Sequence, residues 1–140
     1  MSSPEDARRM QIGEVAQRTE LSIRTLRHYD EVGLVRPSAR SVGGFRLYTE
    51  NDVRRVLVIR RMKPLGFTLA EMGELLDALD VLGSPAVAPE RREAAAAAVR
   101  LCHDRARQAC ASLRRQLAYA EELTAVLADP VGEHPDAVQD

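Results

Sequence analysis

Four side chains that can bind a nucleic acid lie close together in this chain, at Arg24, Arg27, His28 and Tyr29. Arg24 and Arg27 are three residues apart, so they project from the same face of a helix. Arginine can bond bidentately to a guanine edge or to a phosphate, and the other two side chains can donate to phosphate oxygens. The competing interpretation is a cationic helix face that is merely solvated.

A second cationic group flanks a pair of glycines further along the chain. Arg40 and Arg46 lie on either side of Gly43 and Gly44, which predict the tip of a short hairpin because glycine adopts positive φ at little steric cost. Such a ribbon can lay arginines along a DNA backbone or into a minor groove. It would form the wing beside the helix that carries Arg24 and Arg27.

The strand after the hairpin tip alternates in character. Phe45 and Leu47 alternate with Arg46 and Tyr48, which is typical of a strand. We expect Phe45 and Leu47 to point into the core. Tyr48 has two interpretations, because its ring can be buried while its hydroxyl reaches a phosphate.

Two short helices must position the first cationic group. Residues 12–18 predict one helix, and Ser22 predicts the N-cap of a second, because its hydroxyl can accept from the amides of the first turn. The second helix is expected to end at Gly33. Its expected buried stripe is Ile23, Leu26 and Val32.

A second helix pair follows the hairpin. Residues 49–52 predict the cap of a helix that runs to about Met62, and residues 63–66 stop it. Thr68 with Glu71 has the form of a capping box and predicts a helix to about Asp80. The residues expected to be buried in that helix are Leu69, Met72, Leu75, Leu76 and Leu79.

The segment from Glu90 to Ala128 contains no Gly or Pro and predicts a helix roughly 58 Å long. A helix of that length cannot bury one face within so small a domain. Its apolar and small residues step alternately by three and four, as in a heptad seam that pairs with a partner helix. The seam consists of Val99, Cys102, Ala106, Ala109, Leu113, Gln116, Ala120, Leu123 and Leu127. We therefore predict a homodimer.

The charge is divided along the chain. Residues 8–63 carry a net charge of +7 and residues 64–140 a net charge of −6, although the whole chain carries only −1. A basic front half on an acidic body is typical of a polyanion-binding head. No apolar run is long enough to span a membrane, no arrangement typical of an enzyme is present, and we expect a cytoplasmic protein.

The order of these blocks resembles the MerR family of transcription regulators. The matching stretches are residues 12–16, 25–34, 44–48 and 65–72. The resemblance implies a mainly α fold with a winged helix-turn-helix head, a second helix pair and a long C-terminal helix forming an antiparallel coiled-coil dimer. The expected boundaries are a disordered lead at 1–10, the DNA-binding domain at 11–81, a linker at 82–89, the dimerisation helix at 90–128 and a flexible tail at 129–140.

The resemblance also implies a mechanism. Such regulators bind, as homodimers, a near-palindromic site between promoter elements that are spaced too far apart, and they distort the spacer for RNA polymerase. The DNA-binding residues would be Arg24, Thr25, Arg27, His28, Tyr29, Arg40, Gly44, Phe45, Arg46, Tyr48, Arg61 and Lys63.

Control by an effector is the less determined part of the prediction. Metal-sensing members of the family carry thiolates in a loop after the long helix, and residues 129–140 contain no Cys. Members that sense organic cations carry a further domain there. We predict no cofactor and no metal; an inducer would bind near residues 65–82. The alternatives are an effector-independent DNA-binding protein and a helical interaction module.

The two cysteines form a further alternative. Cys102 and Cys110 are eight residues apart, about 12 Å along a helix. An intrachain disulfide needs Cα atoms within about 7 Å, and one metal ion could not bridge them either. An intersubunit disulfide, or a thiol or metal site completed by His103 or by the partner helix, stays open as a switch within the same fold.

Overall fold

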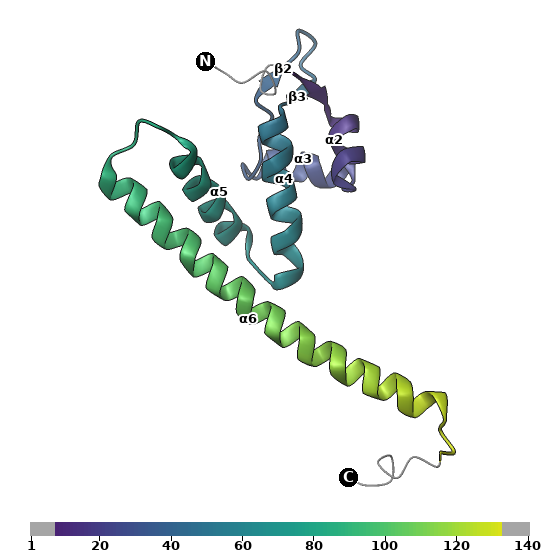
Figure 1. Cartoon of the computed structure of the whole chain (residues 1–140). Coiled ribbons are helices and arrows are strands. Elements are labelled where there is room, and N and C mark those ends of the chain that lie inside the picture. The colour runs from purple at the N-terminus through teal and green to yellow at the C-terminus, as the bar shows by residue number, and fades with distance from the viewer. Residues whose placement is uncertain (1–7, 133–140) are drawn as a thin grey trace. The chain divides into compact units, whose positions relative to one another are not determined.

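The computed structural model describes residues 8–132 and is mainly helical (Figure 1). The elements in chain order are β1 (Met10–Gln11), α2 (Ile12–Thr19), α3 (Ile23–Glu31), β2 (Ala39–Arg40), β3 (Arg46–Tyr48), α4 (Glu50–Met62), the 3-10 helix η1 (Lys63–Leu65), α5 (Leu69–Gly83) and α6 (Pro89–Ala128). Together they confirm the predicted fold class of helix-turn-helix, wing, second helix pair and long helix.

The chain divides into two compact units between Val99 and Arg100. This division falls inside α6, whereas the sequence pattern predicted a linker at residues 82–89. The first turns of α6 belong with the first unit for a local reason. Arg92 donates to the carbonyl oxygens of Leu82 and Ser84, at 3.2 and 2.5 Å, so the start of α6 is bonded to the end of α5.

The helix-turn-helix forms as the caps predicted. The Ser22 hydroxyl accepts from the Thr25 amide at 3.0 Å and begins α3. Glu20 joins the helices with a left-handed backbone (φ 58°). Arg60 of α4 donates to the carbonyl oxygen of Thr19 at 2.7 Å, so α4 holds the last turn of α2 in place.

The buried face of α3 differs from the predicted stripe. Leu26 and Tyr29 are buried, whereas Ile23 and Val32 are exposed. The reason is that α3 ends at Glu31, so Val32 has left the helical path that would have placed it on the stripe. Gly33 follows with a φ of 75°, which glycine adopts without a Cβ penalty.

A three-stranded antiparallel sheet, in the order β1-β3-β2, carries the wing. Met10 pairs with Tyr48, and Arg40 pairs with Arg46. Met10 is buried, so the chain enters the fold before the end of the lead predicted at residues 1–10. Residues 1–7 lie outside the described residues. The β1 strand escaped the sequence analysis because two residues have no periodicity of their own.

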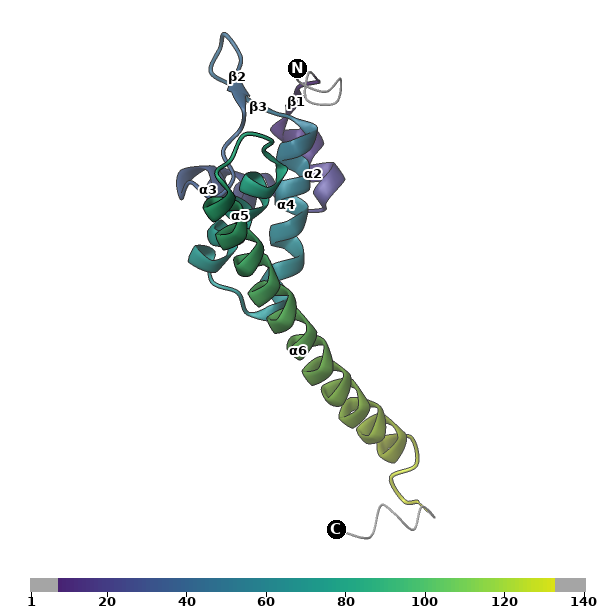
Figure 2. The same cartoon turned by 60° about the vertical axis from the view of Figure 1, so that its left-hand side comes forward.

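The hairpin tip projects beyond the helices of the first unit in both views (Figures 1 and 2). The Gly44 amide donates to the Ser41 carbonyl at 2.9 Å, and Gly44 has a φ of 82°. Phe45 is 68% exposed, so the prediction that it points into the core was wrong. Its ring lies over Gly43, where an added Cβ would meet it at 3.2 Å. The side chain therefore packs on the hairpin itself, because the narrow sheet does not extend to the tip.

The second helix pair begins at two capping boxes, at Thr49 with Asp52 and at Thr68 with Glu71. Asp52 is buried and accepts from both the amide and the hydroxyl of Ser38, at 3.1 and 2.7 Å. The cap of α4 thus also holds the start of the wing.

The helix α5 runs three residues past the predicted end, to Gly83. Met72 and Leu76 are buried as expected, and Ala78 joins them. Leu69 and Leu79 are exposed, which corrects two positions of the predicted stripe. An ion pair between Arg55 and Asp80 links α4 to α5.

The second unit consists of α6 from Arg100 onward and the turn that follows it. The helix ends at Ala128, as predicted, and the Gly132 amide closes a turn on the Asp129 carbonyl at 3.1 Å. The predicted flexible tail lies outside the described residues from position 133. No helix within residues 8–132 is long and apolar enough to cross a lipid bilayer.

Candidate nucleic-acid interface

An open groove of about 700 Å³ runs along the exposed side of α3. Arg24, Arg27 and His28 are exposed there, and Lys63 reaches the same groove from the end of α4. The groove is lined by Arg24, Thr25, Arg27, His28, Tyr29, Glu31 and Lys63. Six of these seven residues belong to the set predicted from the sequence, and tertiary packing brings Lys63 next to α3.

Two members of this group are held by the fold. The Thr25 hydroxyl lies 2.8 Å from the Ser22 hydroxyl, which places it in the N-cap of α3. Tyr29 is buried, and burial raises the pKa of its hydroxyl. Its carbonyl oxygen accepts from the amides of Leu34 and Val35, at 2.8 and 3.2 Å. Tyr29 therefore anchors α3 while its edge lines the groove.

Asp30 connects α3 to the wing. Its Oδ2 accepts from Arg46 Nε at 2.7 Å and from Arg40 Nη2 at 2.9 Å. The Asp30 side chain is only 10% exposed. A carboxylate this sheltered needs charged partners, and here both partners come from the wing. We call these three residues the wing tether.

Charge and burial act in opposite directions on Asp30. Burial by itself would raise the pKa of its carboxyl, but the hydrogen bonds and charges of Arg46 and Arg40 outweigh burial and leave the pKa below its ordinary value. In turn, the hydrogen bond from Asp30 raises the pKa of Arg46. The tether is therefore fully charged near neutral pH.

The tether changes the role expected for the wing arginines. Arg46 was predicted to hold a phosphate, and the structure engages its Nε with Asp30. A guanidinium has five N–H donors, so four remain to approach a phosphate from a fixed position. Arg40 keeps an exposed side chain. The tether thus positions both arginines at the hairpin.

Tyr48 does not lie where a phosphate contact requires. Its side chain is 1% exposed, and its Oη has no hydrogen-bond partner among the described residues. Burial, followed by the charge of Asp30, raises the pKa of this hydroxyl. Of the two interpretations of Tyr48, the structure supports the buried ring and contradicts the phosphate contact.

A Tyr48→Phe variant is expected to unfold with a free energy about 1 kcal/mol higher than that of the parent chain. The change removes a buried hydroxyl without a partner, and such a group costs about 1–3 kcal/mol. Urea denaturation measures the free energy, and Tyr119→Phe, which changes an exposed tyrosine, is the matched control. A loss of DNA affinity in Tyr48→Phe would restore the phosphate contact.

The remaining predicted residues are divided. Gly44 and Phe45 are exposed at the hairpin tip, and Arg61 is exposed on α4 but does not line the groove. The neighbouring Arg60 instead supports the helix-turn-helix through Thr19. Sequence reasoning missed the supporting roles of Asp30 and Arg60. No local pattern marks them, because both bonds join segments that are distant in sequence.

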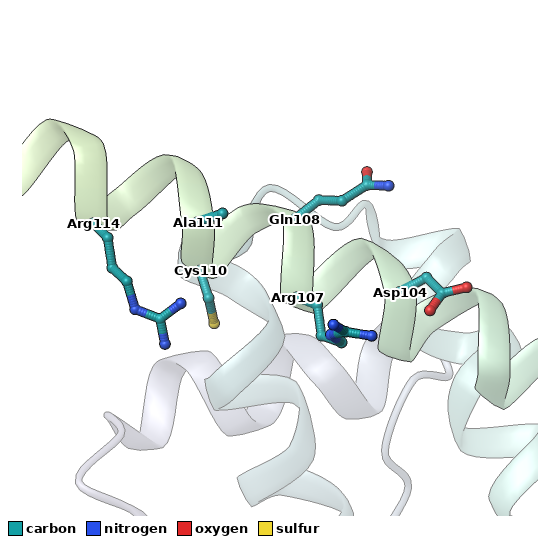
Figure 3. Close-up of a pocket in the computed structure, with 6 residues that line it drawn as sticks. All are labelled: Asp104, Arg107, Gln108, Cys110, Ala111 and Arg114. Carbon is teal, nitrogen blue, oxygen red and sulfur yellow. The ribbon is translucent and has the colours of Figure 1, made fainter.

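A second hollow, of about 590 Å³, follows α6 within the second unit. Figure 3 shows Arg107, Cys110 and Arg114 leaving the helix on the same side. All the lining residues belong to one helix, Asp104 to Arg114, and a single helix cannot enclose a ligand. Cys102 and Cys110 are not joined in a disulfide. Among residues 8–132 no three His, Cys, Asp or Glu side chains gather in a way that could hold a metal ion.

Comparisons with known proteins place this geometry in a family. The chain is 45% identical over 67 residues to an HTH-type transcriptional regulator of Pseudomonas aeruginosa, covering 48% of this chain and 51% of that protein. It covers 26% of the transcriptional activator mta of Bacillus subtilis, with 45% identity over the matched part. The chain thus spans about half, or less, of the length of these curated relatives.

Solved structures show the same fold. The transcription regulator PbrR691 of Ralstonia metallidurans, in complex with lead(II), is 31% identical, with a TM-score of 0.50 over 81% of this chain and 86% of that chain. HiNmlR, a MerR family regulator lacking the sensor domain and bound to promoter DNA, is 21% identical, with a TM-score of 0.66 over 86% and 85%. The second likeness concerns the fold alone.

The family model described as MerR HTH family regulatory protein matches residues 10–79. That segment begins at the buried Met10 of β1 and ends within α5, so it contains the groove, the wing and the tether. It covers half of the chain. The chain therefore belongs to the MerR HTH family of regulatory proteins.

Proposed function

We propose that this protein is a DNA-binding transcription regulator that acts as a homodimer on promoter DNA in the cytoplasm. The observation that carries the proposal is the cationic groove of α3, completed by Lys63 and set beside a wing that Asp30 ties to the same helix. An exposed helix with basic residues on one side can enter a major groove, and a wing can follow the adjacent backbone.

The proposed mechanism uses contact energy to deform DNA. Two heads on one dimer would bind the two halves of a near-palindromic site and distort the spacer between promoter elements for RNA polymerase. Such distortion costs energy that depends on the sequence being deformed. A tethered wing suits this task, because a wing that moved freely against α3 could not transmit strain to the backbone.

The proposal is tested by a footprint and a mobility shift on the DNA upstream of the gene. We expect a protected near-palindromic site and an affinity that falls steeply with salt, because each phosphate contact by Arg or Lys releases counterions. An absence of any shift at low salt would overturn the proposal and favour a helical interaction module.

Arg27→Ala is expected to relax base preference at one position of each half-site by about 1–3 kcal/mol, the range for a bidentate arginine contact to a base. Arg27 is exposed in the groove, so it can reach a base edge. Binding measured against a library of single-base variants of the site checks this. Arg91→Ala, which changes an exposed arginine outside the groove, should leave the preference unchanged. A uniform loss over all sequences would make Arg27 a phosphate anchor.

A further inference from the structure

The second unit presents an apolar stripe that the described chain does not cover. Large apolar side chains are exposed along five turns of α6, from Leu113 to Leu127. They are Leu113, Leu117, Tyr119, Leu123, Val126 and Leu127. A helix that exposes such a stripe is typical of one that packs against a partner helix.

We infer that α6 packs against α6 of a second copy in an antiparallel register centred at the level of Ala118. The inference rests on the homodimer proposed above and specifies its geometry. Because α6 is unbroken from Pro89 to Ala128, the heptad seam keeps one path along it. In this register each residue lies level with the one whose number makes a total of 236.

The seam residues match one another in this register. Leu113 lies level with Leu123 of the partner subunit, Ala109 with Leu127 of the partner subunit, and Gln116 with Ala120 of the partner subunit. In antiparallel helices the positions flanking the seam meet their own copies near the two-fold axis. Leu117 would therefore meet Leu117 of the partner subunit, and Tyr119 would meet Tyr119 of the partner subunit. These contacts would cover the exposed side chains at the centre of the stripe.

The charges of α6 favour antiparallel over parallel pairing. Residues 100–115 carry a net charge of +4, and residues 116–129 carry a net charge of −3. Antiparallel pairing centred near Ala118 places the basic half of one helix beside the acidic half of the other. Parallel pairing in register would place like charges side by side, which is unfavourable within a Debye length of about 8–10 Å.

The charges also distinguish among antiparallel registers. In the register centred at Ala118, Arg114 lies level with Glu122 of the partner subunit, and Arg115 with Glu121 of the partner subunit. Moving the centre by half a heptad keeps seam against seam. A shift toward the N-terminus, however, places Arg114 level with Arg115 of the partner subunit. A shift the other way places Glu121 level with Glu122 of the partner subunit. Only the central register avoids both juxtapositions.

The register has a consequence for the cysteines. The closest pair across the dimer would be Cys110 and Cys110 of the partner subunit, 16 residues apart and hence about 24 Å along the axis. A disulfide needs Cα atoms within about 7 Å. The dimer would therefore exclude an intersubunit disulfide and a metal ion shared between the cysteines of its two helices.

Cysteine cross-linking of the full chain tests the register. Leu113→Cys and Leu123→Cys are made separately in a chain that carries Cys102→Ser and Cys110→Ser. Under mild oxidation a mixture of the two variants should form a covalent dimer, because the two thiols lie at one level. Each variant alone should not, because its two copies lie ten residues apart, about 15 Å along the axis. Ala109→Cys mixed with Leu127→Cys should behave in the same way.

A matched control separates facing from level. Ala111→Cys mixed with Ala125→Cys also satisfies the register, but both residues lie on the side of the helix away from the seam, so no cross-link should form. Cross-linking of Leu113→Cys alone would show a parallel pair and overturn the proposal. An intact dimer in which neither mixture cross-links would overturn the register. A monomer of the parent chain in sedimentation would overturn the dimer itself, and the mobility shift reports DNA binding independently.

Discussion

An Asp30→Ala variant is expected to unfold about 2–3 kcal/mol more easily than the parent chain and to bind DNA more weakly at every sequence. The Asp30 carboxylate is the common acceptor for Arg46 and Arg40. Removing one partner of a buried pair costs about 3–5 kcal/mol, and the loss here is smaller because both arginines keep access to water. Urea denaturation and fluorescence anisotropy on several DNA sequences measure the two effects.

Arg40→Ala is the matched control, since it removes the more exposed partner and leaves the bond to Arg46. Its expected cost is below about 1 kcal/mol, as for an exposed ion pair. Equal stability and equal DNA affinity in Asp30→Ala and the parent chain would show that the tether does not position the wing.

The same variant has a pH signature. The pKa of Asp30 is lowered in the folded chain, so the tether contributes its full stability above the ordinary carboxyl value of 3.8 and loses it as pH falls through the folded-state pKa. The stability difference between the parent chain and Asp30→Ala should therefore be constant near neutral pH and shrink below about pH 3.8. A difference that grew on acidification would contradict the charged tether.

Replacing both Leu113 and Leu123 by Glu is expected to give a monomer that binds the operator at least about 100-fold more weakly. An ionised carboxylate in an apolar seam is costly unless it is paired, and these substitutions would place four of them at two levels of the dimer. The affinity falls because two linked heads gain about 10²–10⁴ over one head. Sedimentation measures the dimer, and anisotropy on the full operator measures the binding.

Leu101→Glu makes the same chemical change at an exposed leucine that lies off the seam, and it should leave both readouts unchanged. A double variant that stays dimeric would contradict the seam as the interface. A monomer with undiminished affinity would show instead that one head binds DNA without help from the other.

Much of the fold was predictable because its signals are local. Ser22, Thr49 and Thr68 begin helices through their own hydroxyls, which accept from amides two or three residues on. The length of α6 follows from the absence of Gly and Pro between Glu90 and Ala128. The exposed cations of α3 follow from helical periodicity, so most residues of the groove were identified before any contact was known.

The errors share a cause. Ile23, Phe45 and Leu69 are apolar residues at positions that periodicity assigns to a core, and all three are exposed. Periodicity states which residues share a face, but it does not state how far the neighbouring element extends over that face. Tyr48 is the converse case, because only packing against β1 and the helices decides that its hydroxyl is enclosed.

The sequence by itself determined the helix caps, the cationic face of α3, the glycine hairpin and the seam of α6, because each depends on residues within one or two turns of one another. The tertiary structure alone decided that Lys63 joins α3, that Asp30 binds both wing arginines and that Tyr48 is buried. Those outcomes depend on contacts between segments ten or more residues apart, which only the packed chain brings together. The residues that face DNA are therefore written in the local pattern, and the rigidity with which they are held comes from the fold.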